Sequence, residues 1–298
     1  MLEPTQAETL AAAPPELQSR HAALVQVLQR YGHLLVAYSG GADSALLLKV
    51  AVDSLGPSRV LGVLGDSASL PRREMAAAVE LAARLGAPLR VLPTRELEDP
   101  RYASNPVNRC YFCKSELYDR LAALAAAEGF DAVADGTNLD DTHEVRPGRT
   151  AGQERAVVSP LLEAGLGKEQ VRSLSRLLGL PTWDKPASPC LASRIPFGQA
   201  VDADKLAQVE AAEEVLQACG IRGGRVRHHG DLARVELPAE CVARLAEPEL
   251  RERLVDGLRA AGFRYVTLDL EPYRRGRLSE AGADASPGAA GPQSETIL

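Results

Sequence analysis

A glycine-rich hexapeptide, Ser-Gly-Gly-Ala-Asp-Ser at residues 39–44, separates an apolar run from an amphipathic segment. Gly40 and Gly41 let the backbone approach an anion closely, and a helix that begins here directs its free N–H groups at that anion. Ser39 and Ser44 add hydroxyl donors. A Walker A loop ends in Lys followed by Ser or Thr, which the hexapeptide lacks, so γ-phosphate transfer is disfavoured. The hexapeptide predicts a phosphate-binding turn of another kind.

Further polar residues follow predicted strands. Asp43 could bind Mg²⁺ or orient the loop. Alternatively, it is an ordinary carboxylate in the first turn of a helix. The segment 135–138, Asp-Gly-Thr-Asn, follows a strand, where an open α/β sheet has its ligand crevice; a plain turn is its alternative. Ser67 or Arg73 would contact the nucleotide or simply begin a helix. The expected nucleotide-binding residues are Ser39, Gly40, Gly41, Asp43, Ser44, Ser67, Gly136, Thr137 and Asn138.

Three of the five cysteines lie in segments that could do chemistry. Cys110 and Cys113 form a CxxC, and Cys190 belongs to the segment 185–196, Lys-Pro-Ala-Ser-Pro-Cys-Leu-Ala-Ser-Arg-Ile-Pro. Both segments are predicted as loops of one domain, and loops at one sheet edge can converge. Nearby cations would favour the thiolates, which are nucleophiles and metal ligands. These cations are Lys114, Lys185 and Arg194.

Other roles for these three cysteines remain open at this point. A structural zinc needs a fourth ligand, for which His143 is the nearby candidate. A redox-active CxxC is less favoured, because the sequence around the motif does not resemble that of a thioredoxin. Inert core thiols do not explain the flanking Arg and Lys residues. Cys219 and Cys241, by contrast, lie among helical apolar residues and are expected to be core thiols.

Apolar runs that alternate with amphipathic segments predict an α/β fold with a parallel sheet covered on both faces. The predicted strands are 34–38, 60–64, 89–92 and 132–134, and the predicted helices are 44–55, 72–85 and 114–128. This pattern assigns residues 17–198 to a nucleotide-binding domain that begins with a helix at 17–31. Residues 1–16, rich in Ala and Pro, are expected to form a flexible arm.

Residues 199–276 are expected to form a smaller α+β domain that binds substrate or mediates oligomerisation. Helices at 200–218 and 247–261 and strands at 225–229, 232–237 and 265–270 are predicted for it. Arg225 and Arg227 alternate along a strand and therefore face one side, where they could grip a phosphate or simply be solvated. The composition of residues 277–298 predicts a disordered tail.

The composition favours a small-molecule enzyme. The net charge of −6 disfavours broad, charge-driven nucleic-acid binding. The apolar runs are too short to cross a membrane, and the first residues lack the basic start of a signal peptide. A cytoplasmic protein is therefore expected, with neither membrane nor nucleic acid as partner.

The turn at 39–44 resembles the SGGxDS loop of the PP-loop ATP pyrophosphatase superfamily, and 135–138 resembles a second segment of it. The resemblance implies an adenine nucleotide alpha hydrolase-like fold that binds the pyrophosphate of ATP, with Mg²⁺, and adenylates a carboxyl or carbonyl oxygen. Residues 185–196 narrow the resemblance to the LarE-type ATP-dependent sulfur transferases of nickel-pincer nucleotide cofactor biosynthesis. This resemblance extends from the turn to about Gly276 and includes Arg146-Pro147-Gly148 and Arg225-Val226-Arg227.

The LarE-type resemblance implies that ATP adenylates a carboxylate of pyridinium-3,5-biscarboxylic acid mononucleotide, a nicotinate-derived substrate. Sulfur then displaces AMP and leaves a thiocarboxylate. In one version of the family the cysteine matching Cys190 gives up its own sulfur; in the other, three cysteines hold a 4Fe-4S cluster. Cys110 and Cys113 suit the second version. The implied catalytic residues are Cys190, Asp43 and Ser39, the substrate-binding residues Arg194, Arg225 and Arg227, and the cluster ligands Cys110, Cys113 and Cys190, in a homo-oligomer.

Two rival functions remain. A PP-loop enzyme that thiolates tRNA can also carry three cysteines and a 4Fe-4S cluster, although this chain is acidic and has one CxxC rather than zinc-ribbon pairs. A non-catalytic nucleotide-binding sensor is the second rival. Binding to tRNA in a gel shift would favour the first, and absence of pyrophosphate release would favour the second.

Overall fold

The computed structural model describes residues 6–143, 147–186 and 188–274. The chain separates into two compact units. The first comprises residues up to 103 together with 108–191, and the second comprises 104–107 and the chain from 192 onward. Arg146 and Gly276 of the family resemblance, and the tail predicted at 277–298, lie outside the described residues. The functional assignment of 17–198 and 199–276 remains a prediction.

The first unit contains a parallel four-stranded sheet in the order β3-β2-β1-β4. Its strands are β1 (Leu34–Ala37), β2 (Val60–Asp66), β3 (Leu89–Pro93) and β4 (Ala132–Ala134). Leu34 is paired with Val60 of β2 on one side and with Ala132 of β4 on the other. The predicted parallel sheet and its four strands are thus confirmed, with ends that differ by one or two residues.

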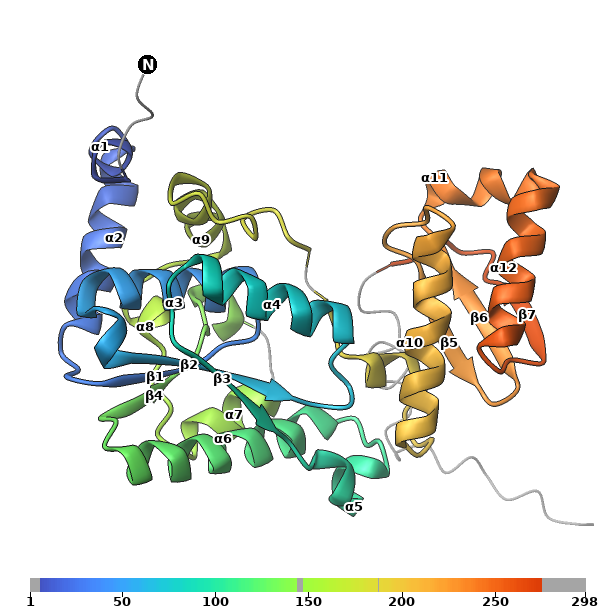
Figure 1. Ribbon diagram of the computed structural model, residues 1–298, viewed down its shortest axis with the longest axis horizontal. Helices are drawn as coiled ribbons and strands as arrows, with labels where there is room; N and C mark the ends of the chain where they lie inside the picture. The colour runs from blue at the N-terminus through green and yellow to red at the C-terminus, as the bar shows by residue number, and fades with distance from the viewer. Residues whose placement is uncertain (1–5, 144–146, 187, 275–298) are drawn as a thin grey trace, which may run out of the picture. The chain divides into compact units, whose positions relative to one another are not determined.

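Helices cover both faces of this sheet. In Figure 1, α3 (Ala42–Leu55) and α4 (Arg72–Arg84) lie on one face, and α6 (Arg109–Glu128) and α7 (Pro147–Gln153) lie on the other. Side chains alternate along β1 as a strand requires. Leu34 and Val36 join the apolar layer with α3, whereas Leu35 joins Tyr118 and Leu121 of α6.

The remaining elements of the first unit are short helices. They are α1 (Gln6–Ala11), α2 (Pro15–Leu28), η1 (Pro57–Arg59), η2 (Glu96–Glu98), α5 (Pro100–Ala103), η3 (Leu139–Thr142), α8 (Pro160–Glu163) and α9 (Lys168–Leu177), where η denotes a 3₁₀-helix. The 3₁₀-helix η4 (Leu191–Arg194) begins at the last residue of this unit.

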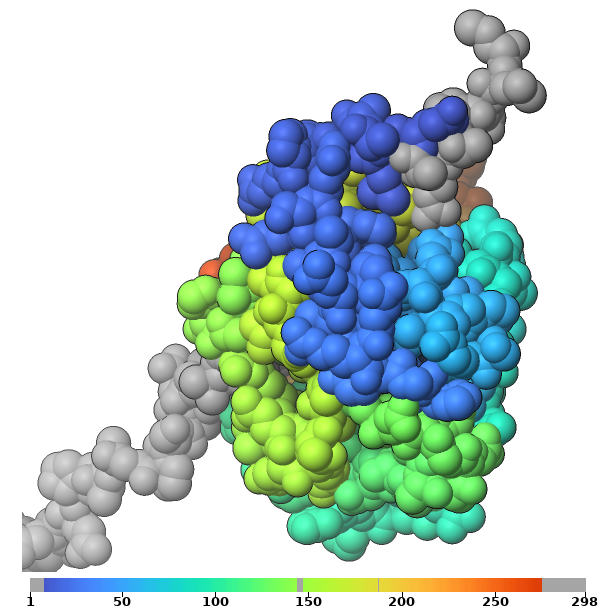
Figure 2. Space-filling model, turned by 90° about the vertical axis from the view of Figure 1, so that its left-hand side faces the viewer, coloured from blue at the N-terminus to red at the C-terminus, as the bar shows by residue number. Residues whose placement is uncertain are grey.

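The segment expected to be a flexible arm, residues 1–16, contains α1 and the start of α2. Pro15 is the first residue of α2, where its fixed φ and missing N–H favour helix initiation rather than opposing it. Leu10 and Leu17 pack against the core of the unit. Figure 2 shows these N-terminal helices, in dark blue, lying on the body of the first unit.

The second unit has a three-stranded sheet in the order β5-β6-β7. Strands β5 (Arg225–His229) and β6 (Leu232–Glu236) are antiparallel, and β7 (Tyr265–Leu268) is parallel to β6. The helices are α10 (Ala203–Ala218), α11 (Ala239–Val242), η5 (Ala243–Ala246) and α12 (Pro248–Ala260). Val226 and Val235 pack with Leu216 of α10 and Leu254 of α12 in one core. The sheet therefore has one apolar face, covered by helices, and one polar face.

Candidate functional site

The carboxyl ends of β1 and β4 are the place in the first unit where a ligand is expected to bind. From β1 the chain crosses to β2 on one side, whereas β4 lies on the other side, so the strand order reverses between β1 and β4. Open α/β sheets bind ligands at this position. The hexapeptide 39–44 follows β1 and the segment 135–138 follows β4. A Cβ atom on Gly136 would lie 2.9 Å from the backbone nitrogen of Ser44, so the two loops touch.

The hexapeptide forms a turn that leads into α3. Gly40 has φ of +70°, and a Cβ atom there would lie 2.5 Å from Cβ of Ala78 on α4, so the position requires glycine. Ser39 N–H donates to Ser44 Oγ over 3.1 Å. No side chain caps α3 at Gly41. The first turn of α3 therefore presents N–H groups that an anion can accept from, as expected for a phosphate-binding turn.

Asp43 lies at the contact between the two loops. Burial raises the pKa of its carboxyl, and the nearby Asp141 carboxylate adds to the rise, while a hydrogen bond from Asn138 lowers the pKa. That bond, from Asn138 Nδ2 to Asp43 Oδ1, is 2.8 Å long. Two neighbouring carboxylates suit a divalent cation that also binds phosphate oxygens. Lys168 Nζ lies 3.5 Å from Asp141 and offsets part of this negative charge.

The loop after β4 is shaped by Asp135. Its carboxylate accepts hydrogen bonds from Thr137 N (3.0 Å), Thr137 Oγ1 (2.9 Å), Ser159 Oγ (2.8 Å) and Tyr118 Oη (3.1 Å). The Thr137 hydroxyl is therefore occupied within the loop. Fully buried Asn138 forms a capping box with Asp141. Of the residues predicted here, Gly136 provides the close approach, and the side chains of Thr137 and Asn138 hold the loop in shape.

Two residues near the turn have contacts that the sequence did not predict. Lys185, considered above as a thiol activator, places Nζ 3.0 Å from the Gly40 carbonyl oxygen and 2.8 Å from Glu74 Oε2 on α4. It therefore contacts the phosphate-binding turn itself. Ser67 donates to Glu96, which is 2 % exposed, so Ser67 is engaged with a buried carboxylate. Neither contact could be predicted from the sequence, because the two residues of each pair lie far apart along the chain.

The three candidate cysteines all belong to the first unit. Cys110 and Cys113 lie in the first turns of α6, not in a loop as predicted, and Cys190 is half-buried just before η4. Desolvation raises the pKa of Cys110 although the residue as a whole is exposed, and a Cys190 thiolate raises it further. Burial also raises the pKa of Cys113, followed by the charges of Glu96 and Cys190. Cys190 is therefore close enough to Cys110 and Cys113 for its charge to act on both thiols, and a shared site for the three remains a prediction.

The expected activation of these thiols by nearby cations does not hold for the CxxC pair. Lys114 lowers the pKa of both Cys110 and Cys113, but burial outweighs it. Both thiols are therefore protonated at neutral pH and would release protons on binding a metal. Residues 6–143, 147–186 and 188–274 contain no group of three or more His, Cys, Asp or Glu side chains that could hold a metal ion. His143 therefore does not complete a zinc site with the cysteines there.

The predicted substrate-binding arginines belong to the second unit. Arg194, 2 % exposed, donates to both oxygens of Glu213 at 2.8 Å. Arg227 donates to Glu236 (2.6 Å) and to the Ser193 carbonyl oxygen (3.0 Å). Arg225 lies 5.0 Å above the Tyr273 ring. Carboxylates and an aromatic ring therefore hold these arginines in place. The partner Glu236 was not predicted from the sequence.

Arg225, Arg227 and Arg234 gather on the polar face of the sheet. Burial and the charge of Arg194 lower the pKa of Arg225. The Nε atoms of Arg225, Arg227 and Arg234 are buried and have no hydrogen-bond partner within the described part of the chain. Buried donors of this kind are satisfied by an anion. The predicted alternation of Arg225 and Arg227 on one strand face agrees with this arrangement.

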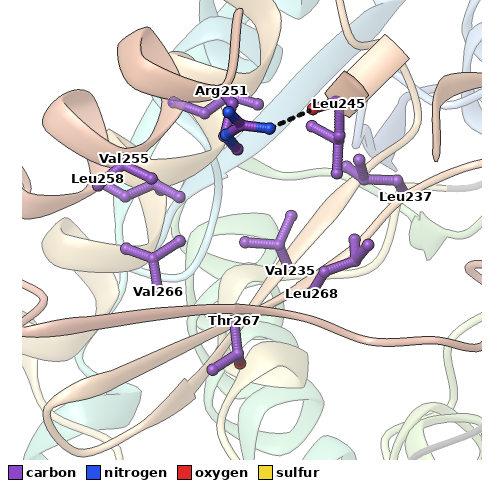
Figure 3. Close-up of a pocket in the computed structure, with 10 residues that line it drawn as sticks. Val235, Leu237, Leu245, Arg251, Val255, Leu258, Val266, Thr267 and Leu268 are labelled. Atoms are coloured by element: carbon purple, nitrogen blue, oxygen red, sulfur yellow. Dashed lines mark hydrogen bonds between the residues drawn. The ribbon is translucent and has the colours of Figure 1, made fainter. Parts of the chain in front are cut away.

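A separate cavity of about 180 Å³ lies on the apolar side of the second unit. Figure 3 shows Val235 and Val266 turned into it from the sheet and Leu258 from α12. At its edge Arg251 donates to the Leu245 carbonyl oxygen over 3.4 Å. None of the predicted site residues lines this cavity. Elsewhere, none of the described helices is both long and apolar enough to span a membrane.

Replacing Gly136 by Ala is expected to weaken ATP binding. The added Cβ would press against the backbone of Ser44 at 2.9 Å, and the two loops must separate. A loss of about 1–3 kcal/mol in stability is expected from such overpacking. Calorimetric titration with ATP and urea unfolding measure both effects. Gly41→Ala is the control for stability, because its Cβ would meet Ser39 Oγ at an ordinary 3.4 Å. Equal losses of unfolding free energy in Gly136→Ala and Gly41→Ala would contradict the close approach of the two loops.

Glu213→Gln is expected to destabilise the second unit by about 3–5 kcal/mol, because it leaves the buried Arg194 charge without its carboxylate. Chemical denaturation followed by circular dichroism measures the loss. The matched control is Glu163→Gln, whose pair with Arg30 is exposed and 3.1 Å long. Glu163→Gln is expected to lower the free energy of unfolding by less than about 1 kcal/mol. Similar losses in the two variants would show that the Arg194 pair is not the buried anchor described above.

Comparisons with known proteins identify the family of the chain. No family model matches the chain. It is 44% identical to an uncharacterized protein of Synechocystis, over 88% of this chain and 98% of that protein. It is 39% identical to the pyridinium-3,5-bisthiocarboxylic acid mononucleotide synthase of Lactiplantibacillus plantarum, over 89% of this chain and 95% of that enzyme. An NH₃-dependent NAD⁺ synthetase of Chlorobaculum tepidum is 27% identical over 62% of this chain and 66% of that enzyme. The chain therefore belongs to the LarE family of pyridinium-3,5-bisthiocarboxylic acid mononucleotide synthases, within the PP-loop superfamily.

Proposed function

We propose that this protein uses ATP to adenylate a carboxylate of pyridinium-3,5-biscarboxylic acid mononucleotide and then converts it to a thiocarboxylate. One observation carries the proposal: a phosphate-binding turn and three cysteines lie in the same compact unit. The segment 185–191 connects them, because Lys185 contacts the turn and Cys190 lies five residues later. The synthase of Lactiplantibacillus plantarum, whose name specifies a bisthiocarboxylic product, supports the substrate class.

In the first step, a carboxylate oxygen of the substrate attacks the α-phosphorus of ATP. The bond to pyrophosphate breaks, and an acyl-adenylate and free pyrophosphate result. The N–H groups at the start of α3 would hold the leaving pyrophosphate. Lys185 Nζ, now shared between Gly40 O and Glu74, would add a positive charge at the same place. Asp43 and Asp141 would hold Mg²⁺ with phosphate oxygens as its other ligands.

In the second step, a sulfur nucleophile at the level of hydrosulfide attacks the acyl carbon. The carbon–oxygen bond to AMP breaks, AMP leaves with the bonding electrons, and one proton is released with the thiocarboxylate. Cys190 would hold this sulfur together with Cys110 and Cys113, or supply it from its own side chain. In the second case the Cys190 thiolate would attack the acyl carbon and displace AMP, and removal of its Cα proton would then break the Cβ–Sγ bond, which leaves dehydroalanine and the thiocarboxylate. We assign the main role in this step to Cys190 because its charge acts on both Cys110 and Cys113.

We further propose that Cys110, Cys113 and Cys190 hold a 4Fe-4S cluster. Three thiolates are the ligand set that such a group takes when one of its irons stays open. The charge of Cys190 acts on both Cys110 and Cys113, which supports their proximity, although the described part of the chain contains no group of three or more His, Cys, Asp or Glu side chains that could hold a metal ion. When bound through three thiolates, such a cluster leaves one iron available to carry a sulfide. The raised pKa values of Cys110 and Cys113 predict proton release when the group is incorporated.

For the substrate, we propose that its phosphate binds the second unit. Arg225 and Arg227 carry buried Nε donors with no partner in the described residues, which a phosphate dianion would accept from. Arg194 would stabilise this face through Glu213 rather than as a mobile ligand-binding side chain. The net charge of −6 offers no broad basic surface for tRNA, which supports a small substrate. A homo-oligomer in the cytoplasm, where thiols stay reduced, completes the proposal.

The proposal is tested by anaerobic incubation of the protein with ATP, Mg²⁺ and the substrate. AMP, pyrophosphate and the thiocarboxylate are expected in equal amounts. Ser in place of Cys190 is expected to abolish the thiocarboxylate while pyrophosphate release continues, because the turn at 39–44 remains intact. Cys219→Ala, a buried thiol of the second unit, is the control that should keep full activity. Failure to form AMP, pyrophosphate and thiocarboxylate with the unaltered chain contradicts the proposal.

The same assay distinguishes the two sources of sulfur. If a cluster carries it, Cys110→Ser and Cys113→Ser each abolish the thiocarboxylate, and anaerobically purified protein contains iron and acid-labile sulfide. If Cys190 gives up its own sulfur, these two variants keep a single turnover, and the intact mass of the protein falls by one hydrogen sulfide. Activity in Cys110→Ser without iron in the parent protein would therefore contradict the cluster.

A further inference from the structure

Tyr102 of α5 has a buried hydroxyl that forms no hydrogen bond within the described part of the chain. The residue is 1 % exposed, and its Oη makes no hydrogen bond within residues 6–143, 147–186 and 188–274. The other two buried tyrosines do have acceptors: Tyr38 Oη donates to the Ala78 carbonyl oxygen (3.0 Å) and Tyr118 Oη to Asp135 (3.1 Å). An unsatisfied buried hydroxyl is unfavourable, so its retention calls for an explanation.

The surroundings of Tyr102 connect it to the cysteines. The Ser69 hydroxyl, which lowers the pKa of the Tyr102 phenol, is bonded to Ser67 over 2.8 Å. Leu191 N–H donates to the Ser69 carbonyl oxygen over 2.8 Å, which fixes Cys190, the preceding residue, next to Ser69. Burial raises the pKa of the Tyr102 phenol, and the charges of Cys190 and Cys113 raise it further. The phenol is therefore protonated, remains a donor and lies within the electrostatic reach of both thiols.

Neighbouring polar groups do not take this proton. The carboxylate of Glu96, buried nearby at 2 % exposure, accepts from Ser67. Ser69 N–H also donates to Ser67 Oγ, over 3.0 Å. These contacts hold the loop after β2 in place without an acceptor for Tyr102. The charges that raise the pKa of this phenol are those of Cys190 and Cys113, whose sulfur is the element that the proposed reaction transfers.

We propose that the Tyr102 hydroxyl donates a hydrogen bond to the sulfur delivered at the site of Cys110, Cys113 and Cys190. The inference rests on the proposed function and adds a residue to its second step. The proton stays on the tyrosine oxygen throughout. Because hydrogen bonds to anionic acceptors are the stronger ones, this donor holds the sulfur in position for attack on the acyl carbon.

The test compares Tyr102→Phe with the parent chain in two anaerobic preparations, one reduced and metal-free, the other loaded with iron and sulfide. In the metal-free protein, Tyr102→Phe is expected to unfold at an equal or higher urea concentration, since it loses no hydrogen bond. Loading is expected to raise the unfolding midpoint of the parent more than that of Tyr102→Phe. The control is Tyr38→Phe, which should unfold earlier in both preparations because Ala78 loses its donor.

Activity gives an independent readout. The rate of thiocarboxylate formation by Tyr102→Phe is expected to fall about tenfold, while pyrophosphate release stays within about twofold of the parent. A parent chain that forms no thiocarboxylate contradicts the proposed function, and the inference is then decided by the two unfolding midpoints alone. Three outcomes would each overturn the inference. The first is a lower urea midpoint for metal-free Tyr102→Phe than for the parent. The others are an equal rise of the midpoint on loading in both proteins, or no rise in the parent.

Discussion

The contact between two loops at the carboxyl ends of β1 and β4 is the constraint on which the rest of the first unit depends. Gly136 leaves space for the backbone of Ser44, and Asn138 bonds the Asp43 carboxylate at 2.8 Å. The first of these fixes the distance between the loops, and the second fixes the orientation of a buried acid. Together they keep the start of α3 open toward the crevice, where the N–H groups of its first turn can meet an anion.

The segment 185–191 extends this constraint to the cysteines. Lys185 contacts the turn through the Gly40 carbonyl oxygen, and Leu191 bonds the loop after β2 through Ser69. Cys190 is therefore held by a short stretch of chain with an attachment at each end. In the proposed reaction, a nucleophile that meets an acyl-adenylate would benefit from such restriction, because orientation removes much of the entropic part of a barrier. The phosphate-binding turn and Cys190 are thus connected through one short stretch of backbone.

Much of the first unit could be predicted from the sequence because short-range patterns specify it. Four apolar runs became four parallel strands, and the glycines at 39–44 and 135–138 marked the ends of two of them. The start of α6 was missed because Cys110 and Cys113 do not follow the apolar spacing that identifies a helix. The Ala- and Pro-rich composition of residues 1–16 predicted a flexible arm, although the first position of a helix accepts proline, as Pro15 of α2 shows. Long-range pairs, such as Lys185 with Glu74 or Arg227 with Glu236, carry no local signal, so only the fold could reveal them.

The position of Cys110 and Cys113 on α6 has an evolutionary consequence. Tyr118, on the same helix, bonds the Asp135 that shapes the loop after β4, so α6 itself belongs to the framework of the nucleotide site. The two thiols stand at its first turns, where Cys110 is exposed. A lineage can therefore exchange these two side chains without rebuilding the framework. Under the proposed function, one scaffold would accommodate both a sacrificial cysteine and a renewable sulfur source, with the substitutions confined to the first turns of α6.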